Sequence, residues 1–272
     1  MTYRRFVALG DSTTEGLRDM YPNGEFRGWA DRLAERLAMD NPELQYANLA
    51  VRGKLARQVR EEQLDAAVAL QPDLASVLSG LNDMLRRDCR VGDVIGELDA
   101  IIGALRAAGA DVLTFTLPDP VPINPIAKSA AARLRNLNRA IRDLTAAHGA
   151  KLIDLEAFPV SSDRRLWDGD RLHANAEGHK RIAAAAAEAL GLEGADRAWT
   201  MDFPDPLTPR SRASHAIWAG RYLTPWLIRR LRGISSGDGR VAKRLSLAPV
   251  DHADGLPLAA RDLAGSQQLD RD

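Results

Sequence analysis

A serine near the start of the chain and a histidine far downstream are the side chains best suited to nucleophilic chemistry. Ser12 stands in Gly10-Asp11-Ser12, and His173 follows Asp170 by three residues. A serine hydroxyl attacks an acyl carbon only when a base takes its proton, and histidine is the usual base. An aspartate at this spacing can orient the imidazole within one turn of chain. The pattern predicts Ser12 as nucleophile, His173 as general base and Asp170 as the orienting carboxylate.

Two further segments supply hydrogen-bond donors that the same chemistry needs. Gly53 could present a bare backbone N–H, and Asn82, in Gly80-Leu81-Asn82-Asp83, could donate from its side-chain amide. Attack on an acyl carbon creates an oxyanion, and each preorganised donor to it is worth roughly 10²–10³ in rate. The four segments together contain nucleophile, base, orienting group and oxyanion donors, which is the full set for acyl transfer.

Each segment alone also has a purely structural explanation. Glycine, aspartate, serine and asparagine are common in turns and helix caps, so the segments at Ser12, Gly53 and Asn82 fit ordinary turns. A single histidine before a helix is often structural. The four segments gain weight from their shared position, because each follows a predicted strand.

Strand and helix patterns alternate through the first 190 residues. Short apolar runs indicate five strands, at residues 5–9, 46–51, 74–78, 112–117 and 151–155. Helical spacing indicates helices at residues 28–39, 55–70, 91–108, 127–147 and 175–190. This alternation predicts a parallel sheet covered by helices on both faces. Ligands bind beyond the carboxyl ends of such strands, which is where the four polar segments fall.

In this order, the four segments resemble the four sequence blocks of the SGNH hydrolases, the GDSL-like lipases and esterases. The matching residues are Gly10-Asp11-Ser12 with Gly16, Gly53, Gly80-x-Asn82-Asp83, and Asp170-x-x-His173. The resemblance covers about residues 4–190. It implies an α/β class protein with a three-layer α/β/α flavodoxin-like fold, a parallel five-stranded sheet and a C-terminal extension.

The resemblance also implies the chemistry. It implies an oxyanion hole made by the backbone N–H groups of Ser12 and Gly53 and the amide of Asn82, and hydrolysis of esters or thioesters without a metal or other cofactor. Ala174 stands where the family usually has proline. The nucleophile elbow of the α/β-hydrolases is absent, because Thr14 occupies its second glycine position.

Two other functions remain open at the level of sequence. The chain could transfer the acyl group to an acceptor other than water, or it could be a non-catalytic binding module on the same fold. The intact serine, glycine, asparagine, aspartate and histidine favour an enzyme, a carboxylic ester hydrolase acting on a small-molecule ester.

Composition argues against several partners and locations. The chain has 37 basic and 37 acidic residues, so no overall field attracts nucleic acid. Cys89 is the one cysteine, which excludes an internal disulfide and a cysteine-based zinc site. The histidines lack metal-binding spacing, and Asp168 with Asp170 offers too few oxygen ligands for a calcium loop. No signal peptide or long apolar run is visible, so we expect a cytoplasmic protein.

The pattern changes near residue 195, which predicts a catalytic domain at residues 1–194, an aromatic and basic appendage at 195–234, and a disordered tail at 235–272. Residues 213–232 could pack on the catalytic domain, meet a membrane surface as a basic amphipathic segment, or form a homodimer. Pro225 is expected to split or kink this segment. Ending the chain at residue 234 is expected to have little effect.

Overall fold

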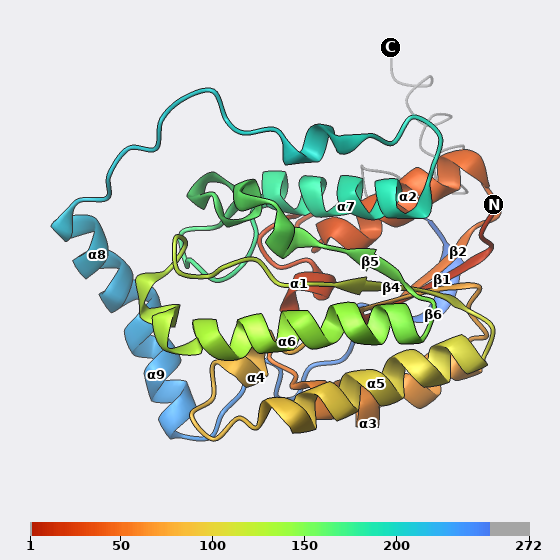
Figure 1. Ribbon diagram of the computed structural model, residues 1–272, viewed down its shortest axis with the longest axis horizontal. Coiled ribbons are helices and arrows are strands. Elements are labelled where there is room, and N and C mark those ends of the chain that lie inside the picture. Colours follow the sequence, from red (N-terminus) through yellow and green to blue (C-terminus); the bar gives the residue numbers. More distant parts are fainter. Residues whose placement is uncertain (1, 251–272) are drawn as a thin grey trace, which may run out of the picture.

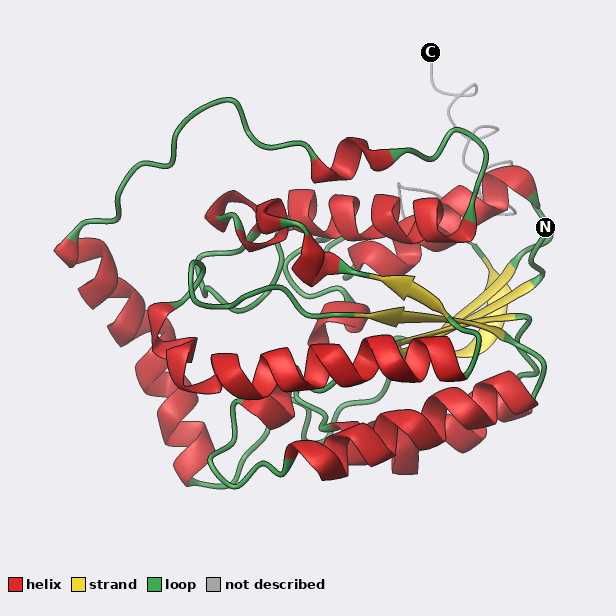
Figure 2. Ribbon diagram, in the orientation of Figure 1, coloured by secondary structure: helices red, strands yellow, loops and turns green. Residues whose placement is uncertain are grey.

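Five parallel strands form the centre of the computed structural model, which describes residues 2–250 (Figures 1 and 2). They are β1 (Arg5–Gly10), β2 (Gln45–Asn48), β3 (Leu74–Leu78), β4 (Asp111–Phe115) and β5 (Lys151–Ile153). Their order in the sheet is β5-β4-β3-β1-β2. This is the flavodoxin-like order, in which the chain changes direction between β1 and β3. Segments that leave β1 and β3 therefore meet at the place where such sheets bind ligands.

Helices cover both faces of the sheet, as the alternating pattern predicts (Figure 1). One layer contains α2 (Gly28–Asp40) and α7 (Ala176–Leu190), and the other contains α3 (Ala56–Ala69), α5 (Val91–Ala107) and α6 (Lys128–Ala147). Each of these helices begins and ends within a residue of its predicted bounds. Phe6, Val7 and Leu9 of β1 are fully buried, because helices lie on both sides of a parallel strand.

Several short turns of helix connect these elements. The sequence pattern treats the helices α1 (Ser12–Glu15) and α4 (Leu81–Met84) as turns, because four residues are too few to show a helical period. The 3₁₀ turns are η1 (Pro125–Ala127), η2 (Leu155–Ala157), η3 (Pro159–Ser162), η4 (Arg164–Leu166) and η5 (Arg197–Thr200).

A sixth strand corrects two expectations. Strand β6 (Arg244–Pro249) pairs antiparallel with β2, so the sheet has six strands rather than five. The expectation of disorder from residue 235 is therefore wrong for residues 235–250, while residues 251–272 lie outside the described residues. Lys243 forms an ion pair with the buried Asp31, and Val250 is buried in the core. These contacts outweigh the polar composition that suggested a disordered tail.

The chain between η5 and β6 forms a helical segment at the end of the molecule toward which the parallel strands point (Figure 1). It consists of α8 (Arg212–Trp218), a π-helical turn η6 (Ala219–Leu223) and α9 (Thr224–Leu231), and we call it the α8–α9 segment. Pro225 lies in the first turn of α9, directly after η6. The wide π turn carries the helix into the proline without a break. No helix among residues 2–250 is long and apolar enough to cross a membrane.

Candidate active site

The structure brings Ser12, His173 and Asp170 together at the carboxyl end of β1. His173 Nε2 lies 3.0 Å from Ser12 Oγ, and His173 Nδ1 lies 2.8 Å from Asp170 Oδ2. A carboxylate accepts but does not donate, so Nδ1 carries the proton of the neutral ring and Nε2 is the acceptor. This is the tautomer that can take a proton from a serine hydroxyl.

The turn that presents Ser12 depends on Gly10. Its φ is +149°, and a Cβ there would lie 2.3 Å from the backbone oxygen of Leu78, so β1 can end beside β3 only with glycine. The buried side chain of Gln63 donates to the Gly10 oxygen and accepts from the Gly10 N–H, both at 2.9 Å. This pair of hydrogen bonds holds the turn in place. Sequence reasoning missed Gln63, because a glutamine within a helix carries no signal of such a contact.

The Asp170 carboxylate is held by several donors. Its Oδ1 accepts from the backbone N–H groups of Leu172 at 2.9 Å and His173 at 3.0 Å, and Arg18 Nε donates to Oδ2 at 3.1 Å. Burial acts to raise the pKa of this carboxyl, but the hydrogen bonds and charge of His173 and the two backbone donors lower it to about 2. Asp170 therefore stays ionised through the range in which esterases work.

Asp168 has a different place from Asp170. Its N–H donates to the backbone oxygen of His173 at 2.8 Å, and its Oδ2 accepts from the N–H of Asp170 at 3.2 Å. These bonds shape the loop and make no contact with the imidazole. Of these two aspartates, it is Asp170, three residues before His173, that contacts the imidazole ring.

Asn82 contacts the residue next to Ser12, and both hydrogens of its amide are engaged. Its Nδ2 donates to Asp11 Oδ2 at 3.1 Å and to the backbone oxygen of Lys54 at 3.0 Å. The amide therefore bridges the residue before Ser12 and the residue after Gly53. Ser12 is the first residue of α1, so its backbone N–H has no partner in the helix ladder. The three expected oxyanion donors belong to segments that are bonded to one another.

Glu15 ties the Gly53 segment to α1. It accepts from the Arg52 backbone N–H at 2.7 Å and from Arg52 Nε at 3.0 Å. Gly53 has a φ of +76°, in the left-handed region, and a Cβ there would lie 2.4 Å from Ser235 Oγ. Glycine is thus required both by the backbone and by the C-terminal chain that lies against it. Neither Glu15 nor Arg52 was a candidate in the sequence, since their pairing spans two separate segments.

Two buried carboxyls stand beside these residues. Burial raises the pKa of Asp11 to about 7, although the backbone N–H of Thr13 and the charge of His173 oppose the rise. Burial likewise raises the pKa of Asp83 to about 6, against the N–H of Ala56, which donates to its carboxylate at 3.1 Å. Asp11 therefore changes its charge close to neutral pH while in contact with the Asn82 amide.

The C-terminal extension contacts the site on both sides. Trp218, in α8, donates from Nε1 to the backbone oxygen of Asp170 at 3.0 Å, and the Arg171 guanidinium lies 4.5 Å from the Trp218 ring centroid. On the other side, Ser235 Oγ donates to the backbone oxygen of Gly53 at 3.4 Å. The aromatic residues beyond 195 were the only sequence signal of these contacts.

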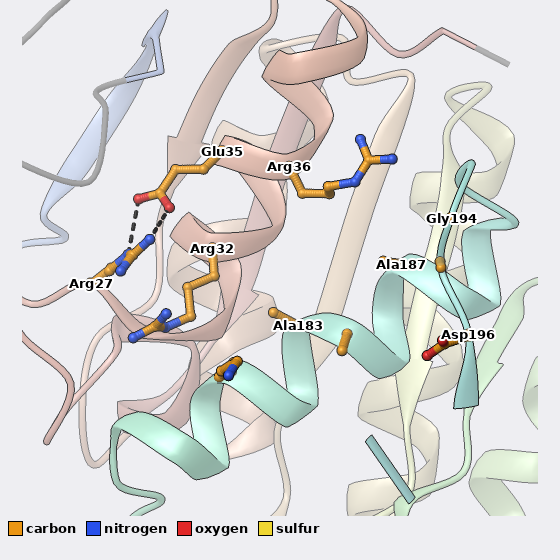
Figure 3. A pocket seen from close by; sticks show the side chains of 11 residues that line it. Arg27, Arg32, Glu35, Arg36, Ala183, Ala187, Gly194 and Asp196 are labelled. Atoms are coloured by element: carbon orange, nitrogen blue, oxygen red, sulfur yellow. Dashed lines mark hydrogen bonds and ion pairs between the residues drawn. The ribbon is translucent and has the colours of Figure 1, made fainter. Parts of the chain in front are cut away.

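Other polar features lie away from this chemistry. A hollow of about 330 Å³ lies between α2 and α7, and its labelled arginines come from α2 and the turn before it (Figure 3). None of Ser12, Asp170 and His173 lines it. Its arginines are partnered within the fold: Arg27 with Glu35, Arg32 with Asp19 and Arg36 with Asp40. Within residues 2–250, no group of three or more histidine, cysteine, aspartate or glutamate side chains could hold a metal ion.

His179 has a structural place. It is fully buried, its Nδ1 accepts from the N–H of Trp29 at 3.1 Å, and its Nε2 donates to the backbone oxygen of Leu17 at 2.9 Å. Burial lowers its pKa to about 4, so the ring is neutral near pH 7 and joins α7 to α2 and to the turn that follows α1.

Comparison with known families decides the classification. The model of the GDSL-like Lipase/Acylhydrolase family matches residues 8–181, which contain Ser12, Gly53, Asn82, Asp170 and His173. The chain belongs to this family. As a GDSL-family protein it has the expected α/β/α fold and is a hydrolase of the esterase type. No curated protein sequence matches the chain.

Solved structures of similar fold include esterases. TesA is 21% identical, with a TM-score of 0.58 over 69% of this chain and 98% of TesA. LAE5, an alpha/beta hydrolase enzyme from the metagenome of Lake Arreo, Spain, is 23% identical, with a TM-score of 0.58 over 69% of this chain and 95% of LAE5. Axe2, an acetylxylan esterase from Geobacillus stearothermophilus, is 17% identical, with a TM-score of 0.57 over 70% of this chain and 95% of Axe2. These neighbours match nearly their whole length and leave about three tenths of this chain uncovered.

Proposed function

We propose that this GDSL-family protein is a serine esterase that cleaves carboxylic or thio esters through an acyl-enzyme on Ser12. The observation that carries the proposal is the continuous line of hydrogen bonds from Asp170 through His173 to Ser12 Oγ. A hydroxyl bonded to a neutral imidazole, which is bonded in turn to an ionised carboxylate, is the arrangement that activates serine.

The reaction follows from this geometry in two stages. His173 Nε2 takes the proton of Ser12 Oγ while Oγ forms a bond to the acyl carbon. The imidazolium, paired with Asp170, then gives that proton to the departing alkoxide or thiolate. In the second stage His173 takes a proton from water, the hydroxide attacks the acyl-enzyme, and the acid leaves as Ser12 recovers its proton. Each stage returns His173 to its neutral form.

Three donors are proposed to stabilise the oxyanion: the backbone N–H groups of Ser12 and Gly53 and the amide of Asn82. Asn82 must release one of its present acceptors to reach an oxyanion, since both amide hydrogens are engaged by Asp11 and Lys54. Because the pKa of Asp11 is about 7, its protonation weakens its competition for that amide. The Asn82 amide is therefore held in place before substrate arrives, and its hydrogen bond can then pass from Asp11 to the oxyanion.

The test is covalent labelling together with turnover. A fluorophosphonate should label the wild-type protein at Ser12 and should not label Ser12→Ala, which should fold normally and lose nearly all hydrolysis of p-nitrophenyl esters. Labelling that persists in Ser12→Ala contradicts the proposal. A panel of ester chain lengths beside acetylated sugars would define the substrate, and products formed with added alcohols would reveal transfer to an acceptor other than water.

A further inference from the structure

The α8–α9 segment and the residues just after it carry several large aliphatic side chains in contact with water. Ile217, Leu227, Ile228 and Leu231 are 67%, 44%, 43% and 88% exposed, and Ile234, just beyond α9, is 49% exposed. We call these five residues the docking face. Trp218, on the inner side, is only 7% exposed. A concentration of exposed aliphatic residues on one element marks an interaction site rather than ordinary surface.

The same stretch of chain has a strong positive charge. Residues 206–237 contain six arginines and neither aspartate nor glutamate, although the whole chain has equal numbers of acidic and basic residues. Arg212, Arg221, Arg229 and Arg232 are exposed. Exposed basic and exposed aliphatic side chains therefore occur together on this helical segment.

The spacing in α9 places the two kinds of side chain as an interfacial helix requires. Leu227, Ile228 and Leu231 are separated by one, three and four residues and so share one side of the helix. Arg229 and, one residue beyond the helix, Arg232 lie next to this stripe on the side of Ile228, and arginine can extend its guanidinium toward charged groups while its stem lies along apolar surface. Helices of this pattern lie in the plane of a membrane with the apolar side among the headgroups and acyl chains.

We propose that the docking face of the α8–α9 segment binds the surface of an anionic lipid membrane. A second copy of the chain is a poorer occupant. A two-fold dimer through this face would bring the same arginines of both copies together, with no carboxylate in residues 206–237 to neutralise them. Anionic headgroups satisfy the arginines, and the acyl region takes the aliphatic side chains.

This docking would set the candidate active site beside the bilayer. The inner side of the segment contacts the catalytic loop through the bond from Trp218 to Asp170, so the outer side cannot meet a membrane without bringing that loop close to it. The proposal depends on no catalytic step, and it can therefore fail or hold independently of the esterase activity.

The test is sedimentation of the full chain with lipid vesicles at low ionic strength. The wild-type protein should bind vesicles of phosphatidylcholine with phosphatidylglycerol and should bind phosphatidylcholine alone much more weakly. Arg229→Gln with Arg232→Gln should weaken binding roughly thirtyfold, because each basic residue near an anionic surface contributes about a factor of five. Leu227→Ser with Leu231→Ser should weaken it by at least as much.

Matched controls separate docking from general stickiness and from catalysis. Met39→Ser changes a 77% exposed apolar residue on α2, and Arg87→Gln changes an exposed arginine; both should bind like the wild type. Ser12→Ala should also bind fully. The proposal is overturned if the wild type does not bind anionic vesicles. It is also overturned if both double variants of the docking face bind them as well as the wild type does. A dimer, found by ultracentrifugation, that Leu231→Ser dissociates overturns it too.

Discussion

The indole N–H of Trp218 donates to the backbone oxygen of Asp170 across a distance of 3.0 Å. This bond joins α8, which lies beyond the family match at residues 8–181, to the loop that carries Asp170 and His173. Between Asp170 and His173, Arg171 adopts a left-handed backbone with a φ of +60° and packs its guanidinium on the Trp218 indole. A non-glycine residue keeps such a conformation only when its surroundings hold it there.

Trp218→Phe should therefore affect catalysis more than stability. The variant keeps a ring in the site but loses the donor, which should cost about 1 kcal/mol of unfolding free energy. Because the Asp170 loop becomes less well held, kcat should fall several-fold with little change in KM. Trp199→Phe is the matched control, since Trp199 is equally buried, at 7% exposure, and donates to Glu188 at 2.6 Å away from the site. Equal effects on kcat would contradict a positioning role.

Asp170→Asn should cost far more activity than Asp168→Asn. The amide at residue 170 cannot hold His173 in the required tautomer, and the expected loss in kcat is about 10³–10⁴-fold. Asp168 contacts backbone of the loop and the Arg18 guanidinium, at 3.5 Å, but not the imidazole, so kcat of its variant should fall little more than tenfold. A pH series of kcat/KM is the measurement. In the wild type, Asp170 stays ionised down to about pH 2, so its own protonation should not limit the acid side of the profile. A reversed order of the two variants would contradict the assignment.

Asn82→Ala should lower kcat by about 10²–10³-fold and leave KM nearly unchanged, because an oxyanion donor acts on charge that develops in the transition state. Steady-state kinetics on one p-nitrophenyl ester would measure the split. An effect confined to KM would instead place Asn82 on the ground-state substrate.

Asp11→Asn should change how stability depends on pH. The folded-state pKa of Asp11 is about 7, above its usual value of 3.8, so the folded protein holds this proton more tightly than the unfolded chain does. The resulting stability is fully present below pH 3.8 and is lost as pH rises through 7. Relative to Asp11→Asn, the wild type should lose about 2–4 kcal/mol of unfolding free energy between those limits. The measurement is urea unfolding of both proteins. A difference in unfolding free energy between the wild type and Asp11→Asn that is the same at pH 5 and at pH 8 would contradict this.

Ending the chain at residue 234 should be strongly destabilising, contrary to the expectation from sequence. The shortened chain lacks β6 and leaves the buried Asp31 carboxylate without Lys243. Breaking a buried ion pair costs about 3–5 kcal/mol, and the edge of β2 is also left open. Urea unfolding of the shortened chain and of Lys243→Met would separate the two contributions. A midpoint equal to that of the full chain would show that β6 contributes nothing.

Much of the fold could be predicted from sequence because its signals are local. The apolar run at residues 74–78 follows Pro72 and has the bounds of β3, and each long helix carries its own apolar spacing. Strand β6 could not be found in this way. Its residues have a mixed character that ends in Pro249, and their pairing is decided by β2 and by the contact of Lys243 with Asp31.

The candidate site shows the same difference between local signals and pairings that only the fold creates. Ser12, Asp170 and His173 could be proposed because their types and their positions after strands are legible in the sequence. The residues that hold them could not be. Gln63 acts on Gly10, and Trp218 acts on Asp170, through pairings that only the folded chain creates. A tryptophan or glutamine has no spacing rule that points to a distant backbone oxygen.

Strand β6 also sets the order in which a newly made chain can finish folding. Chains fold as they leave the ribosome, N-terminal parts first. A nascent chain that has reached residue 194 contains all five residues of the candidate site, but it still lacks Trp218, Ser235 and the strand that covers β2. We expect such a chain to expose an unpaired sheet edge while synthesis continues and to gain full esterase activity only after residue 250 has been released.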